Sequence, residues 1–296
     1  MPSLKEVKNR IASVKSTRKI TNAMKMVASS KLHHAQKAIE GMRPYEGRLE
    51  AIMGRFLSAT DGEIETPFSV NRPVKNVAII AISSNSSLCG AYNANVIKEL
   101  YRVVKEYQSQ GINVEVFPIG KKVAAAAKKI VATNTETDYA DALDHPSYKN
   151  ASAISELFMQ RFCDEQIDKV EIISHHFISS SKQQLFTKTF LPINLETDKS
   201  DPKEENGGGR SLDYIIEPSP SSIISSLIPA SLHMQVFTAI LDSLASEHAS
   251  RVMAMQVATD NADDLIEQLT LTYNKTRQQA ITSELLDIAG GSNNSN

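Results

Sequence analysis

The sequence predicts a mixed α/β protein in which two long helices, one near each end of the chain, pair as an antiparallel coiled coil around an inserted α/β domain. Three observations lead to this prediction. Glycine and proline are absent between Ser3 and Glu40 and again from Ala230 to Ala289, so both stretches lack the residues that most often end a helix. The two stretches carry opposite net charge. The segment between them alternates strand-like and helix-like patterns.

The first helix is expected within residues 1–58. Its apolar residues alternate at spacings of three and four, as the seam of a coiled coil requires. The stripe shifts at Arg18 and then resumes. Its first part is Leu4, Val7, Ile11 and Val14, and its second part is Ile20, Met24 and Val27.

The second helix is expected over residues 230–290, paired with the first. Residues 1–58 hold 12 Lys and Arg against 4 Asp and Glu, and residues 230–296 hold 3 against 8, so the two ends can attract each other or can each face a partner of their own. We expect Val14 to face a residue between Leu241 and Met255. Two unconnected helices in an ordinary bundle are the alternative. The seam positions are Leu241, Leu244, His248, Arg251 and Met255, followed by Leu265, Leu269, Ile281, Leu285 and Ile288.

The inserted domain is expected over residues 74–229. Val77–Ser83 and Val114–Gly120 are strand-like, and an amphipathic helix follows each of them. A third helix precedes the strand KVEIISHHF, and KQQLFTKTFLPI is a further strand. Strands and helices that alternate at these lengths are typical of a parallel sheet, so the domain is expected to be Rossmann-like. The charged, glycine-rich residues 196–213 are expected to form a mobile loop.

Composition limits the class of protein. Of the 296 residues, 41% are apolar and 22% are charged, as in an ordinary soluble protein. The two cysteines, Cys89 and Cys163, are too few for a disulfide framework and indicate a reducing compartment. We find no run of about 18 apolar residues, so we expect no membrane-spanning segment. The basic N-terminus is lysine-rich and helical well beyond any cleavage point, so it is expected to be mature structure rather than a transit peptide.

Few residues have the pattern of a catalytic or ligand site. Neither GxxxxGK[ST] nor GxGxxG follows the first strand, so no cofactor is expected. Cys89 lies between a strand and a helix, where a thiol can be activated, but it has no neighbouring histidine to act as its base. We interpret it as a packed turn residue, with an α/β enzyme that uses Cys89 as nucleophile as the alternative. The pairs His33–His34 and His175–His176 point to different faces, so no metal site is expected. The basic helix lacks interleaved aromatic residues, so no nucleic-acid partner is expected.

Three segments carry a resemblance to a known family. IASVKSTRKITNAMKMVASSKL near the N-terminus, SSLCGAYN after the first strand, and ATDNADDLIEQLTLTYNKTRQQAIT near the C-terminus resemble the gamma subunit of F-type ATP synthases. The resemblance covers nearly the whole chain in order. Ser87 departs from it, because a glycine usually precedes the Leu-Cys-Gly of the turn.

The resemblance implies a central rotor that is not itself an enzyme. Its partners would be the alpha and beta subunits of the catalytic ring, the epsilon subunit and the c-subunit ring. It would bind peripherally at the cytoplasmic face of the bacterial inner membrane, without insertion. A passive coiled-coil scaffold is the remaining alternative. The residues implied as partner contacts are Met24, Lys25, Arg251, Arg277, Gln278 and Thr282. The segment Asn274–Gln279 is polar on every side, and contacts with other chains would explain this.

Overall fold

The computed structural model describes residues 3–59, 66–131, 139, 141–193 and 220–292. These residues divide into two compact units. We call residues 1–30 with 251–296 the terminal unit, and residues 31–250 the sheet unit. The two longest helices, α1 (Leu4–Ala59) and α6 (Pro220–Ser292), each contribute to both units. The loop expected at residues 196–213 lies outside the described residues.

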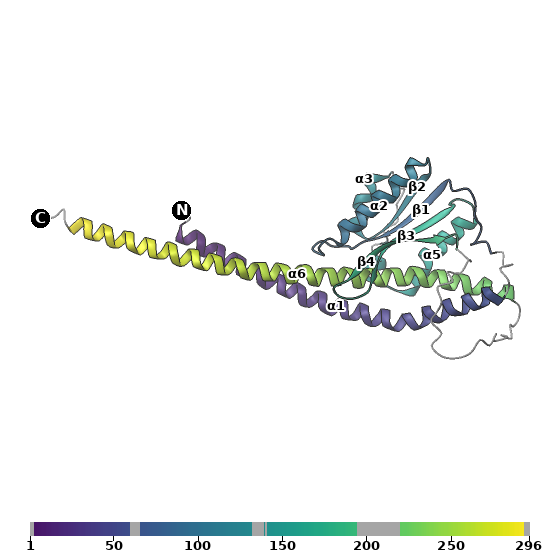
Figure 1. Ribbon diagram of the computed structural model, residues 1–296, viewed down its shortest axis with the longest axis horizontal. Helices are drawn as coiled ribbons and strands as arrows, with labels where there is room; N and C mark the ends of the chain where they lie inside the picture. Colours follow the sequence, from purple (N-terminus) through teal and green to yellow (C-terminus); the bar gives the residue numbers. More distant parts are fainter. Residues whose placement is uncertain (1–2, 60–65, 132–138, 140, 194–219, 293–296) are drawn as a thin grey trace. The chain divides into compact units, whose positions relative to one another are not determined.

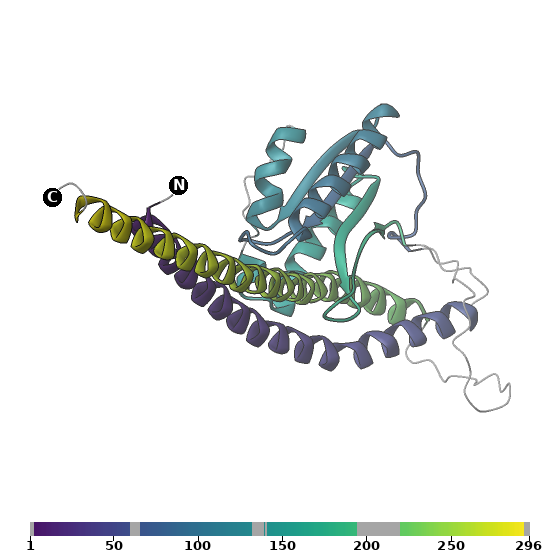
Figure 2. The same ribbon diagram turned by 60° about the vertical axis from the view of Figure 1, so that its left-hand side comes forward.

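The sheet unit is built on four strands in the order β2–β1–β3–β4 (Figure 1; Figure 2). The strands are β1 (Asn76–Ile82), β2 (Asn113–Ile119), β3 (Lys169–Phe177) and β4 (Gln183–Leu191). The helices between them are α2 (Tyr92–Ser109), α3 (Lys121–Ile130), α4 (Asp141–Asp144) and α5 (Tyr148–Cys163). The predicted α/β class is therefore confirmed.

The sheet is not parallel throughout, which corrects the prediction. β1 pairs in parallel with both β2 and β3, so that Ile80 lies between Phe117 and Ile172. β4 pairs antiparallel with β3. Only residues 178–182 join these two strands, whereas a parallel crossover needs about a dozen residues or more. The short connection therefore forces a hairpin, closed by hydrogen bonds from the amides of Ile178 and Ser179 to the carbonyl oxygen of Lys182.

Apolar side chains cover both faces of the sheet. Along β1 the alternate residues Ala78, Ile80 and Ile82 face one core, and Val77, Ile79 and Ala81 face the other. Helices α5 and α6 close the first core, and α2 and α3 close the second. A strand buried on both faces needs a continuous apolar run, which is why NVAIIAI lacks alternation. The N-terminal part of α6 is thus one of the helices that cover the sheet.

Helix α6 begins earlier than the sequence analysis expected. It starts at Pro220 rather than at residue 230, and Pro229 lies inside it. The prediction used Pro229 as the boundary because proline usually breaks a helix interior. Here Ile228 and Leu232, on either side of that proline, are buried in the sheet core. Burial of this turn favours continuing the helix despite the lost backbone hydrogen bond.

In the terminal unit, α1 and α6 form an antiparallel pair, as predicted. Arg18 Nη1 contacts Asp263 Oδ1 at 2.6 Å, and the hydroxyls of Thr21 and Thr259 lie 2.9 Å apart. This register places Val14 beside about Glu267 and not between Leu241 and Met255, so that expected pairing is wrong. Apolar seams of similar period can be aligned at several offsets, and only the polar cross-contacts select one.

The seam of α1 also differs from its prediction. No shift occurs at Arg18, because the three-and-four spacing continues through polar residues. Ile20 and Val27, expected in the seam, are 57% and 60% exposed, whereas Ala28 is buried. The residues of this segment that contact α6 through hydrogen bonds are Arg18, Thr21 and Lys25.

One stretch of α6 is long and apolar enough to cross a membrane by length and composition, in contrast to the sequence-based statement above. Of the 18-residue window that meets this criterion, 61% is buried inside the protein. Leu232, Val236 and Ile240 of α6 belong to the core of the sheet unit. A buried core helix satisfies the same criterion as a membrane span, so the stretch is explained by packing.

Candidate functional site

The first expected contact residues, Met24 and Lys25, lie on α1 in the terminal unit. Lys25 Nζ donates a hydrogen bond to Gln256 Oε1 at 2.9 Å, so this lysine helps to hold the helix pair together. Met24 is half-buried. Ile20, Met26 and Val27 are each more than half exposed. We call these three residues the exposed α1 face; they are the apolar side chains of this segment that a partner would meet.

Arg251 is placed differently from the other expected contact residues. Its side chain is buried within the chain, and it already has an interaction partner there. A buried, paired guanidinium is less available to another subunit than an exposed one. Arg251 is therefore better suited to holding α6 in place than to a partner contact.

Arg277, Gln278 and Thr282 lie close to the C-terminal end of α6. The Arg277 and Gln278 side chains are exposed, and the Thr282 hydroxyl donates to the Gln278 carbonyl oxygen at 2.9 Å, within the helix. From the Arg18–Asp263 pair, the first residue of α1, Leu4, lies beside about Arg277. In both views α6 continues past the start of α1 (Figure 1; Figure 2). α1 therefore reaches along α6 only to about Arg277, and Gln278 and Thr282 lie beyond the first residue of α1.

The same end of α6 exposes large apolar side chains. We call Leu271, Ile281, Leu285 and Leu286 the terminal α6 face, and each is at least 45% exposed. The predicted place of Ile281 and Leu285 in the seam is wrong, because α1 begins too late to cover them. Their spacing of four residues is the signal for one apolar face, but spacing alone does not tell whether the covering helix belongs to the same chain.

The β1–α2 turn holds Cys89 as a packed residue. Its thiol is buried, and Asn93 Nδ2 donates a hydrogen bond to Cys89 Sγ at 3.1 Å. Asn93 Oδ1 also accepts from the Ser84 amide at 3.0 Å, which closes the turn. Leu88 and Gly90 adopt positive φ angles of 66° and 59°. A nucleophilic cysteine needs access and a base, and the described contacts of Cys89 supply neither, so the packed-turn interpretation is favoured.

At the carboxyl edge of the sheet, the amides that would cradle a phosphate in a nucleotide-binding fold are used by the chain itself. The Val123 amide donates to Ser83 Oγ at 2.9 Å, and the Lys121 amide donates to Asn85 Oδ1 at 3.1 Å. At Gly120, where φ is 110°, an added Cβ would lie 2.5 Å from the Ser83 carbonyl oxygen. The two loops therefore touch where a phosphate would bind.

The histidine pairs are also separated by their surroundings. His175 is buried and stacks on Tyr92 with ring centroids 4.4 Å apart, and burial lowers its pKa to about 4. His176, on the other face of β3, contacts Asp242 of α6. Within the described residues, no group of three or more His, Cys, Asp or Glu side chains is arranged to hold a metal ion.

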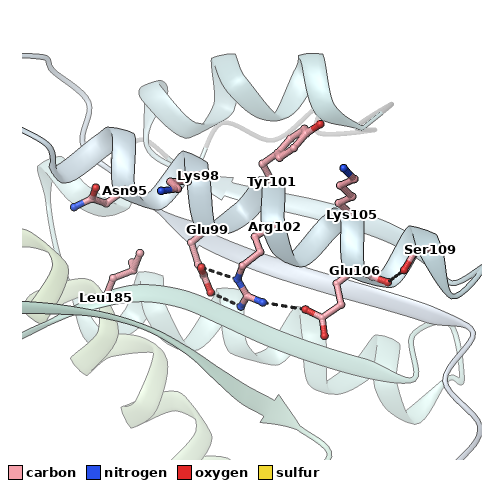
Figure 3. A pocket seen from close by; sticks show the side chains of 9 residues that line it. All are labelled: Asn95, Lys98, Glu99, Tyr101, Arg102, Lys105, Glu106, Ser109 and Leu185. Carbon is pink, nitrogen blue, oxygen red and sulfur yellow. Dashed lines mark hydrogen bonds and ion pairs between the residues drawn. The ribbon is translucent and has the colours of Figure 1, made fainter.

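An open groove of about 720 Å³ lies along α2 (Figure 3). Arg102 lies in its wall with hydrogen bonds to Glu99 and Glu106 at 2.7 and 3.0 Å. The hydrogen bonds from Arg102 lower the pKa of Glu99. Since two carboxylates already satisfy this guanidinium, the groove does not present a free Arg102 to a phosphate. Its lining consists of Asn95, Lys98, Glu99, Tyr101, Arg102, Lys105, Glu106, Ser109 and Leu185.

Comparison with known proteins agrees with this arrangement. The family model described as ATP synthase matches residues 3–294. The chain is 56% identical to the ATP synthase gamma chain of Phocaeicola vulgatus over 99% of both chains, and 44% identical to that of Parabacteroides distasonis over 98% of both. A chain in the rotor of the Euglena gracilis mitochondrial ATP synthase has a similar fold. Its TM-score is 0.62 at 18% identity, covering 94% of this chain and 98% of that one.

The fold and the match to the ATP synthase family model define the class of protein: this chain is a subunit of an ATP synthase. Relatives at 56% and 44% identity over essentially their whole length are gamma chains. The chain therefore belongs to the gamma-chain family of ATP synthases.

Proposed function

We propose that this chain is the central rotor of an F-type ATP synthase. It transmits rotation, driven by ion flow through the membrane sector, to a catalytic ring of alternating alpha and beta subunits. In the opposite direction, ATP hydrolysis in the ring turns it. The single observation that carries this proposal is the full-length relationship to gamma chains, and the apolar surface left open on α1 and α6 is consistent with it.

The mechanism follows from asymmetry. A single shaft inside a ring of three similar pairs touches each pair differently, so the three catalytic sites are biased toward different conformations. Such a bias requires contacts whose free energy differs between those conformations. The nucleotide and the catalytic groups then belong to the beta subunits, and this chain acts as a non-catalytic subunit. At the carboxyl edge of its sheet, the Val123 and Lys121 amides already donate hydrogen bonds within the chain, which supports the placement of the nucleotide on the beta subunits.

The partners are assigned to the two units by their surfaces. The terminal unit contacts the alpha and beta subunits through Met24, the exposed α1 face and the end of α6. On α6, Arg277, Gln278 and Thr282 supply polar contacts beside the terminal α6 face, and polar contacts can be rehydrated as the shaft turns. An Arg can form paired hydrogen bonds with a carboxylate that Lys cannot reproduce. Lys25 supports these contacts through its hydrogen bond to Gln256, and Arg251 supports them from its buried position on α6.

The sheet unit binds the epsilon subunit and the c-subunit ring. The chain is thereby peripheral at the cytoplasmic face of the inner membrane, and the apolar stretch of α6 stays in the core of the sheet unit rather than in lipid.

Reconstitution tests this function. The complex is assembled in lipid vesicles from its other subunits with and without this chain, and ion-driven ATP synthesis is measured. We expect synthesis only when the chain is present. Equal synthesis in its absence would refute the rotor assignment, and failure of the chain to copurify with the nucleotide-binding subunits would count against it as well.

A further inference from the structure

The C-terminal end of β3 lies between the two long helices, inside the sheet unit. Phe177, its last residue, is buried in a cluster with Leu32 and Ile39 of α1 and with Leu241 and Ala245 of α6. Arg43 of α1 donates a hydrogen bond from Nη2 to the Phe177 carbonyl oxygen at 3.1 Å. One strand of the sheet is therefore held by both helices at the same point.

Asp242 supplies the contact from α6. Its carboxylate is almost fully buried, and Oδ2 lies 2.5 Å from His176 Nδ1. The Phe177 backbone also forms a hydrogen bond with Asp242, and the charge of Arg43 acts on it from α1. The second carboxylate oxygen, Oδ1, has no hydrogen-bond partner among the described atoms. Asp242 is thus a buried acidic group whose pairing depends on β3.

Burial of a carboxylate at this position is unfavourable for the stability of the folded chain. Burial raises the pKa of Asp242, and only the hydrogen bond and charge of His176, with smaller effects from Arg43 and Phe177, oppose that effect. Apolar residues of similar volume often stabilise a buried site more than an ion pair does. Stability alone therefore does not explain an aspartate here.

What the carboxylate adds is a fixed register. A shift of α6 by one residue turns a side chain by about 100° and moves it by about 1.5 Å, which would leave the buried charge unpaired. Further polar contacts of this part of α6 also fix its register. Tyr92 donates its hydroxyl to the Ser243 carbonyl oxygen at 3.0 Å, and Ser250 Oγ contacts Gln183 Oε1 at 3.3 Å. Residues of α2, β3 and β4 thus hold one short segment of α6.

We propose that Asp242 is a positioning residue for rotary coupling, which fixes the axial and rotational setting of α6 on the sheet unit through His176. This inference rests on the proposed function as a rotor. Torque that reaches the sheet unit has to pass into α6 without slip, and a buried charge that is paired in one register only opposes slip in both directions.

The test uses the complete complex in lipid vesicles. ATP hydrolysis and ATP-driven ion uptake are measured together, and their ratio reports coupling. We expect Asp242→Asn and His176→Gln each to lower the ratio of uptake to hydrolysis by at least about threefold, because each removes the contact between the His176 ring and the buried carboxylate. His176→Lys should keep most of the coupling, because a flexible ammonium can still reach the carboxylate. The double variant Asp242→Asn with His176→Gln should lose no more than either single variant.

Glu115→Gln is the matched control. It breaks the Arg161–Glu115 ion pair, 2.8 Å long, which joins α5 to β2 without touching α6. Its coupling should equal that of the wild type. The proposal is overturned if Asp242→Asn and His176→Gln couple as well as this control, or if His176→Lys loses as much coupling as His176→Gln.

If Asp242→Asn fails to assemble, the His176 variants decide the matter, because the His176 side chain is 47% exposed and we expect its replacement to permit folding. Failure of the rotor function itself gives a different result. In that case the complex with the wild-type chain would show no ATP-driven uptake beyond that of the complex without the chain.

Discussion

The two parts of α6 are the same helix in two different environments. In the sheet unit, residues 228–249 are mostly buried, and their side chains fill the core between α6, the sheet and α1. In the terminal unit, residues 263–286 are mostly exposed, and Arg18 and Asp263 form an exposed ion pair between the two helices. An exposed ion pair of this kind stabilises a protein by only about 0–1 kcal/mol.

The difference shows that helix length and helix burial are separate properties of this sequence. The first part of α6 is specified by the core that it completes. The second part is specified by its register against α1 and by side chains that remain exposed to solvent in this chain. Substitutions of apolar core residues in the first part should therefore act on folding, and substitutions in the second part should act on assembly and turnover.

The largest effect is expected from a matched pair of leucines on α6. Leu232 is 1% exposed in the sheet unit and Leu271 is 65% exposed in the terminal unit. Leu232→Ala should lower the free energy of unfolding of the isolated chain by about 2–5 kcal/mol, because it leaves a cavity. Leu271→Ala should change it by less than about 0.5 kcal/mol. Chemical denaturation of both variants measures this, and equal losses would remove the distinction between the two parts.

The next effect is a pH dependence confined to the sheet unit. Burial lowers the pKa of His175 to about 4, from about 6.5 in the unfolded chain. Between these values the unfolded chain binds a proton that the folded chain does not. The free energy of unfolding should therefore fall as the pH is lowered from about 6.5 to 4, by up to about 1.4 kcal/mol per pH unit.

His175→Phe is the control for this pH effect. It keeps an aromatic ring against Tyr92 and removes no hydrogen bond, since His175 Nδ1 has none among the described atoms. Denaturation curves at several pH values should show a weaker dependence in this variant. An unchanged slope would mean that another group causes the acid sensitivity.

A smaller effect, on turnover or assembly and not on the stability of the isolated chain, is expected at the end of α6. Arg277→Ala combined with Gln278→Ala removes two exposed side chains, so the isolated chain should stay within about 0.5 kcal/mol of the wild type. The assembled complex should lose ATP turnover or assembly several-fold, because the partner contact is lost. Lys275→Ala, on the same exposed segment, is a useful comparison variant. If the double variant retains wild-type turnover and assembly, these residues are a solvated helix end without a partner.

The smallest functional effect tests the register of the helix pair. The hydroxyls of Thr21 and Thr259 are 2.9 Å apart, so Thr21→Cys with Thr259→Cys should form a disulfide within one chain on mild oxidation. ATP turnover should be nearly unchanged, because the bond repeats an existing contact. Val14→Cys with Met255→Cys should not crosslink, since the register separates these positions by about 18 Å along the axis. A reversed result, seen on non-reducing gels, would overturn the register.

Much of the fold could be predicted from the sequence, because the signals are local. The buried run at β1 and the apolar face of α2 with Val96, Leu100 and Val103 appear in the structure where they were expected. The antiparallel β4 was missed, although the short connection after Phe177 carried the information. The start of α6 was misplaced because Pro229 was given more weight than the apolar residues around it.

The candidate site was harder to predict, because it depends on which apolar positions are covered by this chain and which would be covered by partner chains. The apolar positions Ile20, Val27, Ile281 and Leu285 have the spacing of a seam, and the structure leaves all four exposed. Periodicity identifies a face that needs covering, but it does not identify the chain that covers it. Thr21 and Lys25, which do contact α6, are polar and carried no such signal.

The terminal α6 face also has a consequence for the chain before assembly. A newly synthesised copy presents Leu285 and Leu286 to water on a helix end that lies beyond the start of α1. Exposed apolar patches of this kind favour self-association and capture by chaperones and proteases. Copies made in excess of their partners should therefore be removed quickly. We expect the cell to match the synthesis of this chain to the supply of the subunits that bury its tip.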